Sequence, residues 1–232
     1  MKLLLALLAG GKFAKVALSG GTMLLSVFAY ALLFGWAYGV ALVGLIFIHE
    51  MGHFIAARRN GLAVGAPVFI PFVGAWVSIK DDALDDQTMA QVALAGPVLG
   101  SVAAFLSYLY WDQTGSSLWL AIAYAGFFIN LINLIPIGML DGGRIVKVVS
   151  TRLWLLGVPL LIAAFVWQPS PLLLVFGIAA LPELWGALRG HAPPTTAPLQ
   201  ARIRIGAAYL GLSIALAIMA YQSHEQLAHL RH

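Results

Sequence analysis

Long apolar stretches separated by short polar connections run through most of the 232-residue chain. A helix needs about 20 apolar residues to cross a bilayer, and no long polar insert interrupts the series. The pattern therefore predicts an all-α polytopic membrane protein with about six or seven transmembrane helices, forming a single integral membrane domain over residues 1–232. Residues 1–10 are expected to form an uncleaved interfacial leader. The predicted spans lie near residues 17–36, 37–57, 88–110, 117–137, 153–167, 171–188 and 205–221.

One segment breaks this helical pattern. Residues 62–80 mix β-forming side chains with proline and glycine, which predicts a short β-like or re-entrant segment at the membrane edge. Irregular backbone is tolerated at membrane depth only where it is buried in protein or faces a wet cavity. We therefore expect this segment to lie against the functional site.

The composition excludes water as the main solvent of this chain. Hydrophobic residues make up 61% of the sequence and charged residues 9%, whereas a soluble domain carries roughly a quarter charged residues. The mean hydropathy is +0.92, so the lipid bilayer is the expected surrounding. Cysteine is absent from the sequence, which excludes disulfides and thiolate metal sites. Any metal must therefore be bound by histidine and carboxylate side chains.

The positive charges mark membrane topology. If the N-terminus is cytoplasmic and the seven predicted spans alternate in direction, twelve of the 13 Lys and Arg residues fall on the inner side, as the positive-inside rule requires. We interpret the net charge of +4 in this way and expect no nucleic-acid partner. The acidic run between the second and third spans, at residues 81–86, is interpreted as a solvated face. The inner basic residues are Lys2, Lys12, Lys15, Arg58, Arg59, Lys80, Arg144, Lys147, Arg152, Arg189, Arg202 and Arg204.

A His-Glu-x-x-His motif stands at the inner end of the second predicted span. His49 and His53 are four residues apart, so a helix returns both imidazoles to one face. This pair suits a catalytic zinc ion, which takes three protein ligands and leaves a fourth position for water. Glu50, beside the pair, is positioned to take the proton of that water. Ionisable groups inside a span are costly and mark function by default.

A third ligand is needed, and the candidate carboxylates are Asp141, Glu183 and the aspartates of the acidic run. Asp141 is favoured because proline and glycine break the fourth predicted span near its inner end, at the depth of the histidine motif. Glu183 lies near the inner end of the sixth predicted span and is interpreted as an interfacial partner of Arg189.

A similar run near the C-terminus provides an internal control. His224 and Glu225 are followed by a second histidine, His229, one residue later than the motif requires. Side chains five residues apart point to different helix faces. We therefore interpret this run as a solvated tail without a metal.

Two motifs together resemble the site-2 protease family of intramembrane zinc proteases. They are His49-Glu50-x-x-His53 and Asn133-x-x-Pro136-x-x-x-Leu140-Asp141-Gly142-Gly143, and Ala95-Gly96-Pro97 in the third span adds a weaker feature. The resemblance implies a catalytic core at about residues 37–150, with accessory spans in residues 1–36 and 151–232. Small residues in this core would let its helices pack closely.

The resemblance also implies the roles of individual residues. One catalytic Zn²⁺ ion is expected between His49, His53 and Asp141. Asn133 is expected to bind the substrate carbonyl or its oxyanion, and Asn130 to be a second helper.

The sequence thus predicts a zinc metalloendopeptidase that hydrolyses peptide bonds in or near transmembrane segments of membrane-protein substrates. Its expected location is the cytoplasmic membrane of a bacterium or archaeon, with the N-terminus in the cytoplasm. Two alternatives stay open. One is a membrane metalloprotease with Glu183 as the third ligand, and the other is a non-catalytic zinc-binding membrane protein.

Overall fold

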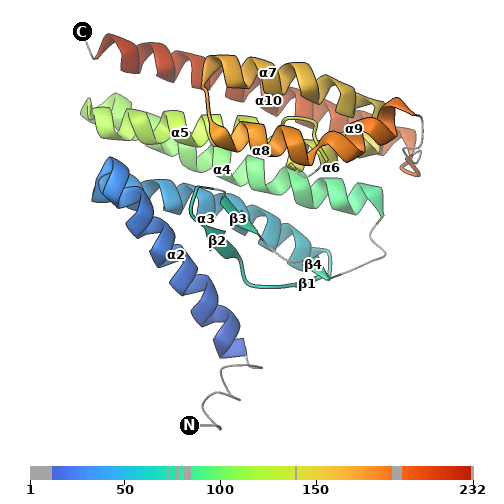
Figure 1. Cartoon of the computed structure of the whole chain (residues 1–232), viewed down its shortest axis with the longest axis horizontal. Helices are drawn as coiled ribbons and strands as arrows, with labels where there is room; N and C mark the ends of the chain where they lie inside the picture. Colours follow the sequence, from blue (N-terminus) through green and yellow to red (C-terminus); the bar gives the residue numbers. More distant parts are fainter. Residues whose placement is uncertain are drawn as a thin grey trace.

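Helices account for most of the molecule (Figure 1). The computed structural model describes residues 12–72, 74–76, 79–80, 85–138, 140–189 and 195–230. The predicted helical class is confirmed, whereas the expected leader at residues 1–10 lies outside the described residues. The helices are α2 (Lys12–Phe34), α3 (Trp36–Arg59), α4 (Asp86–Thr114), α5 (Ser117–Asn133), α6 (Asp141–Val149), the 3₁₀ helix η1 (Thr151–Leu156), α7 (Gly157–Trp167), α8 (Pro171–Ala179), α9 (Leu181–Leu188) and α10 (Leu199–His229).

Four of the described helices are long and apolar enough to cross a membrane, namely α2, α3, α4 and α10. Two shorter apolar stretches, Ser117–Asn133 and Thr151–Trp167, lie between α4 and α10. The predicted count of six or seven spans is therefore not confirmed. The shortfall has a local cause: α5 ends at Asn133, and the stretch expected at 171–188 is divided into α8 and α9.

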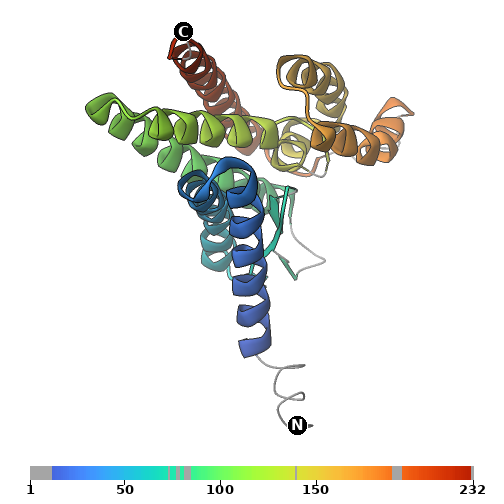
Figure 2. The same cartoon turned by 60° about the vertical axis from the view of Figure 1, so that its left-hand side comes forward.

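The helices stack in three layers (Figures 1 and 2). The α2–α3 hairpin forms one layer, α4 and α5 form the middle one, and α10 lies on the far side with α7, α8 and α9. The short helix α6 packs against both α4 and α10. The middle layer therefore lies between the histidine motif on α3 and helix α10, whereas α8 borders the same cavity as that motif.

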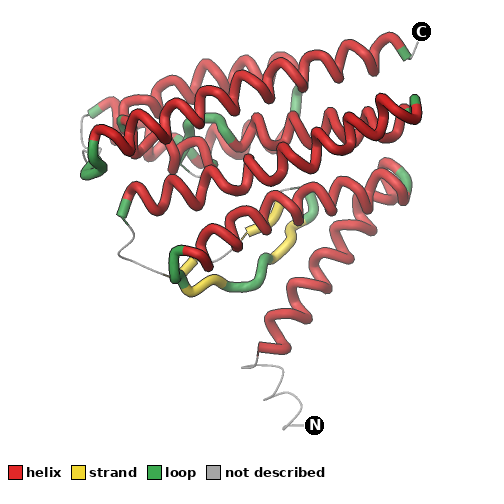
Figure 3. Tube along the Cα trace, turned by 180° about the vertical axis from the view of Figure 1, so that it is seen from behind, coloured by secondary structure: helices red, strands yellow, loops and turns green. Residues whose placement is uncertain are grey.

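Among the described residues between α3 and α4 there are four short strands, which lie beside α2 and α3 (Figure 3). The predicted β-like segment at residues 62–80 is thus confirmed. The turn after β2 places Phe72 at a φ of 66°, and the Phe72 N–H donates a hydrogen bond to the Tyr30 hydroxyl (3.1 Å). The pairs are antiparallel: β1 (Ala63–Val64) with β4 (Ile79–Lys80), and β2 (Val68–Ile70) with β3 (Gly74–Trp76).

Large apolar side chains are exposed on the outward faces of the helices. On α10, Leu210, Ile214 and Ile218 follow each other at four-residue spacing and are 58%, 59% and 51% exposed. Such a stripe forms one helix face, and burying it in hydrocarbon is favourable by about 25 cal/mol per Å² of apolar surface. The fold is therefore that of a membrane protein.

The acidic run differs from its prediction at Asp86. The Oδ1 atom of Asp86 lies 2.9 Å from Nζ of Lys147, which ties the start of α4 to α6. Asp85 caps α4 by accepting hydrogen bonds from the hydroxyl and the N–H of Thr88, and these bonds lower the pKa of Asp85. The expected solvated face thus does not hold at Asp86, and residues 81–82 lie outside the described residues.

Candidate metal centre

The centre is built on one turn of α3 that carries both histidines of the motif. Because His49 and His53 are four residues apart, their rings share a face of the helix. The ring centroids are 4.8 Å apart, and the two Nε2 atoms are 3.1 Å apart. Both residues are buried, with exposures of 4% and 8%.

Hydrogen bonds on the far side of each ring fix both imidazoles. Nδ1 of His53 lies 2.8 Å from the carbonyl of Val92, which can only accept, so this nitrogen is the donor. Nδ1 of His49 lies 2.8 Å from Oδ1 of Asn130, whose amide nitrogen donates to the Gly126 carbonyl at 2.7 Å. The Asn130 oxygen therefore accepts from His49. In neutral rings both Nε2 atoms then carry lone pairs, as metal-binding imidazoles do.

Asp141 reaches the same point from a different element. Helix α5 ends at Asn133, and a non-helical connection containing Pro136 leads to Asp141, the first residue of α6. Its Oδ2 atom lies 3.2 Å from Nε2 of His49 and 3.2 Å from Nε2 of His53. Asp141 is 7% exposed, and among the described residues this oxygen has no hydrogen-bond partner.

Three atoms with lone pairs therefore converge at one buried point. These atoms repel one another unless a cation lies between them. Zn²⁺ binds histidine nitrogen and carboxylate oxygen at about 2.0–2.2 Å, so the edges of its tetrahedron are about 3.3 Å. The three separations of 3.1, 3.2 and 3.2 Å match that edge. The donor set of two imidazoles and one carboxylate fits zinc with a fourth position left open.

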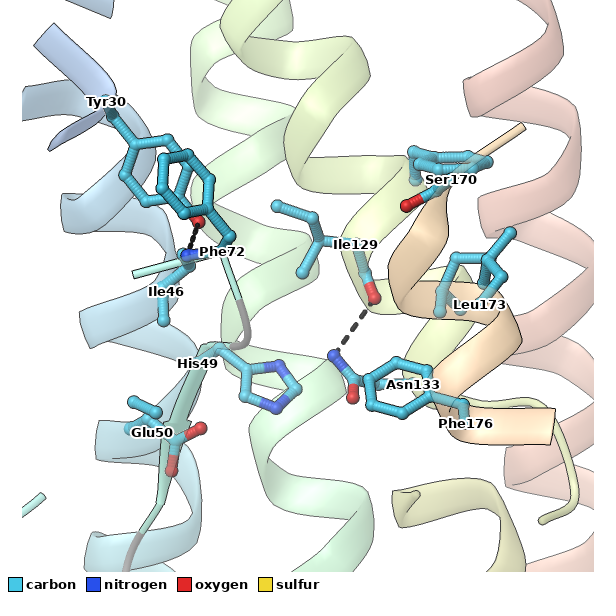
Figure 4. Close-up of a pocket in the computed structure, with 13 residues that line it drawn as sticks. Tyr30, Ile46, His49, Glu50, Phe72, Ile129, Asn133, Ser170, Leu173 and Phe176 are labelled. Carbon is cyan, nitrogen blue, oxygen red and sulfur yellow. Dashed lines mark hydrogen bonds between the residues drawn. The ribbon is translucent and has the colours of Figure 1, made fainter. Parts of the chain in front are cut away.

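Glu50 and His49 border a cavity of about 180 Å³ (Figure 4). Glu50 is 7% exposed. One ligand atom from each of His49, Glu50 and His53 lies within 4.8 Å of the others, a grouping that could hold a metal ion. A carboxylate beside a metal position and open to a cavity can serve as a base for bound water. The remaining lining residues, most of them apolar, are Tyr30, Ile46, Phe72, Ala75, Phe128, Ile129, Ile132, Asn133, Ser170, Leu173 and Phe176.

The two asparagines of α5 occupy different places. Asn133 lines the cavity opposite His49, and its Nδ2 donates to the Ile129 carbonyl at 3.0 Å (Figure 4). Since an amide nitrogen has two hydrogens, a second donor remains on Asn133. Asn130, expected as a second helper at the substrate, instead lies behind His49 and is 2% exposed.

Comparisons with known proteins identify relatives of this chain. Residues 37–116 and 110–156 match the model of peptidase family M50. The chain belongs to peptidase family M50. It is 28% identical over 190 residues to "Probable zinc metalloprotease EGY2, chloroplastic" of Oryza sativa, covering 56% of this chain and 34% of that relative. It is 29% identical over 158 residues to the corresponding EGY1 of Arabidopsis thaliana, covering 48% and 28%.

A bacterial relative is also similar. Rip3 of Mycobacterium tuberculosis, a candidate zinc metalloprotease by name, is 28% identical over 123 residues, which cover 50% of this chain and 31% of Rip3. The chain thus spans about a third of the length of these curated relatives.

In this M50 protein, two glycines of α4 make room for the centre. A Cβ atom on Gly96 would collide with the imidazole of His53, and one on Gly100 would collide with the amide of Asn130. Sequence reasoning noted Gly96 only as a packing residue and missed Gly100. The Val92 carbonyl carries no sequence signal at all, because every residue type supplies the same backbone oxygen.

The rival third ligand, Glu183, belongs to α9. Its side chain lies outside the described part of the structure. Arg189, its expected ion-pair partner, places its guanidinium carbon 4.3 Å from the centroid of the Trp185 ring, a cation–π contact. Asp141 is the carboxylate that lies within 3.2 Å of both imidazoles.

Proposed function

We propose that this M50 protein is an intramembrane zinc metalloendopeptidase that hydrolyses peptide bonds in or near transmembrane segments of other membrane proteins. The observation that carries the proposal is the buried convergence of His49 Nε2, His53 Nε2 and Asp141 Oδ2. Membership of the M50 family supports it.

The chemistry follows from the residues around that point. His49, His53 and Asp141 would hold one Zn²⁺ ion, which when bound supplies a Lewis acid that lowers the pKa of water toward about 7. Glu50 takes a proton from the attacking water and delivers it to the leaving nitrogen. Asn133 donates its second N–H to the carbonyl oxygen on which negative charge develops.

The lining of the cavity suits apolar side chains of a substrate. Aromatic and aliphatic side chains such as Phe72, Phe128 and Ile129 form most of its wall, and they suit residues that come from a membrane. The substrate must be unwound near the scissile bond, because a helical backbone holds its carbonyls in hydrogen bonds. Phe72 and Ala75 of the β2–β3 segment line the cavity. This segment is therefore placed to pair with an extended substrate chain, as peptides pair with exposed strands.

The membrane topology is also a proposal. We infer one membrane domain of six or seven spans with a cytoplasmic N-terminus, a catalytic core at about residues 37–150, and a location in the cytoplasmic membrane of a bacterium or archaeon. The one-sided distribution of Lys and Arg supports this topology. Alkaline phosphatase fused after residue 115 or 169 should be active, because both connections then face outward. Inactive fusions at both positions would contradict this topology.

The function is tested with the full chain in lipid nanodiscs and the variant Glu50→Gln. Both forms should carry one zinc per chain by atomic emission, because Glu50 is not needed as a ligand. Cleavage of a panel of transmembrane peptides should fall by roughly 10²- to 10⁴-fold in the variant, the usual contribution of a general base. Glu225→Gln, a change at an exposed glutamate of α10, is the matched control and should leave both readouts unchanged.

The outcomes separate the rival functions. A wild-type protein that binds zinc and cleaves no peptide would favour the non-catalytic zinc-binding protein. A Glu50→Gln variant with wild-type cleavage would remove Glu50 as the base, and a wild-type protein without zinc would remove the metalloprotease proposal altogether.

A further inference from the structure

Helix α10 contacts the segment that carries Asp141, although it lies outside the residues that match the M50 family model. The match ends at residue 156, whereas α10 begins at Leu199. The helix packs along α5, α6 and α4 (Figure 2). The proposed chemistry does not use α10, so its contacts with the segment that carries Asp141 need an explanation.

The first contact is made at the start of the Asp141 segment. The hydroxyl of Tyr209 donates a 2.7 Å hydrogen bond to the carbonyl of Leu134, the residue that caps the C-terminal end of α5. Carbonyls at a helix end have no partner within the helix, and Leu134 is 2% exposed. Without Tyr209 this buried carbonyl would lose its side-chain donor.

The same carbonyl touches the residue beside Asp141. A Cβ atom on Gly142 would collide with the carbonyl oxygen of Leu134, so the two backbones are in direct contact. The Leu134 carbonyl is therefore held between Tyr209 on one side and the neighbour of Asp141 on the other. A displacement of this carbonyl would move the start of α6.

The second contact is made at the other end of the segment. Nη2 of Arg202 donates a 2.7 Å hydrogen bond to the carbonyl of Val149, the last residue of α6. A guanidinium at a helix C-terminus also interacts favourably with the helix dipole. Arg202 and Tyr209 are seven residues apart, about two helical turns, and therefore lie on one face of α10.

We propose that Tyr209 and Arg202 are positioning residues that hold residues 134–149 at both ends, so that Asp141 stays in register with the two imidazoles. This inference rests on the proposed function, since it assigns the third ligand to Asp141. The imidazoles are held by partners on α4 and α5, Val92 and Asn130. Positioning of the carboxylate thus comes from a separate helix.

The first test is the apparent zinc dissociation constant of the full chain in nanodiscs, measured by competition with a chelator. Tyr209→Phe keeps the ring and removes only the hydroxyl, and it should weaken zinc binding by about 10-fold, within the range of ligand-supporting residues. The matched control is Tyr221→Phe, at an exposed tyrosine of the same helix, which should leave zinc binding unchanged.

The second test uses the other end of the segment. Arg202→Gln should weaken zinc binding by a similar factor of about 10, and Arg202→Lys, which retains a cationic donor, should restore part of it. The control is Arg204→Gln, at an exposed position two residues away, which should have no effect.

A merely structural role predicts a different result. It would lower the melting temperature of the metal-free protein and leave the zinc dissociation constant of the folded fraction unchanged, and that pattern would overturn the inference. Wild-type zinc binding in both Tyr209→Phe and Arg202→Gln would overturn it as well. If the wild-type protein bound no zinc, the proposed function would fail first, so the two failures are distinguishable.

Discussion

Two regions of the molecule contain two histidines and a glutamate within a few helical residues, and only one of them forms a polar centre. In α3, His49 and His53 are 4% and 8% exposed, and their Nε2 atoms are 3.1 Å apart. In α10, His224 and His229 are five residues apart, and the second of them is exposed. The first region also faces a buried carboxylate on another helix, that of Asp141.

In the second region, His224 lies beside aromatic rings. Its ring lies 5.5 Å from the Tyr124 ring and 5.9 Å from the Trp167 ring, measured between centroids. The predicted solvated tail is therefore wrong for His224, because α10 continues to His229 and packs this imidazole among aromatic rings. The comparison teaches that a metal centre needs both helical register and a carboxylate on a facing element. The predictions below test each requirement.

The largest effect is expected from removing the facing carboxylate. Asp141→Ala should weaken zinc binding by more than about 100-fold, beyond the loss typical of residues that only support a ligand. Cleavage should then fall to background. Zinc content after dialysis and a competition titration measure the loss.

Glu183→Ala is the matched variant for this prediction. It should keep one zinc per chain, because Asp141 is the carboxylate within 3.2 Å of both imidazoles. Zinc lost from Glu183→Ala and retained by Asp141→Ala would transfer the third-ligand role to Glu183.

The next effect concerns Asn133, which lines the cavity without touching either imidazole in the described contacts. Asn133→Ala should lower kcat by roughly 10²- to 10³-fold, the cost of losing one donor to a developing oxyanion. The zinc dissociation constant should stay at the wild-type value. A parallel loss of zinc would show that Asn133 supports the metal and would remove its assignment to the oxyanion.

The sequence predicts the ligand residues of this site but not the contacts that orient them. A four-residue spacing is enough to bring His49 and His53 to one face, and the proline and glycines near Asp141 indicate a helix break. The orienting carbonyl of Val92 and the two contacts from α10 depend on tertiary packing between distant segments. No periodicity in the sequence encodes them.

The fold shows the same division. Apolar length predicts α2, α3, α4 and α10 well, because each is a single uninterrupted helix of sufficient length. Between residues 117 and 188 the described helices are shorter than the expected spans, so the predicted number of spans there is not confirmed. Turns inside an apolar stretch change its hydropathy little, so hydropathy alone does not locate the helix breaks in this part of the chain.

A smaller effect is expected at Asn130, which orients His49 from behind. Asn130→Ala should weaken zinc binding by about 10- to 100-fold, the typical cost of removing a partner of a metal-binding histidine. Cleavage at saturating zinc should recover most of its rate, which distinguishes this variant from Asn133→Ala. Wild-type affinity in Asn130→Ala would mean that the α3 helix alone is sufficient to orient His49.

The smallest effect is expected from repairing the spacing of the second region. Deleting Leu227 brings the second histidine of α10 four residues after His224 and creates a His-Glu-x-x-His sequence. The four-residue spacing of the histidines alone should not be enough to bind zinc. The described neighbours of His224 are the rings of Tyr124 and Trp167 and include no carboxylate. The zinc content should therefore stay at one per chain by atomic emission. A second tightly bound zinc, retained when Asp141→Ala empties the first site, would show that helical spacing is sufficient and that a facing carboxylate is dispensable.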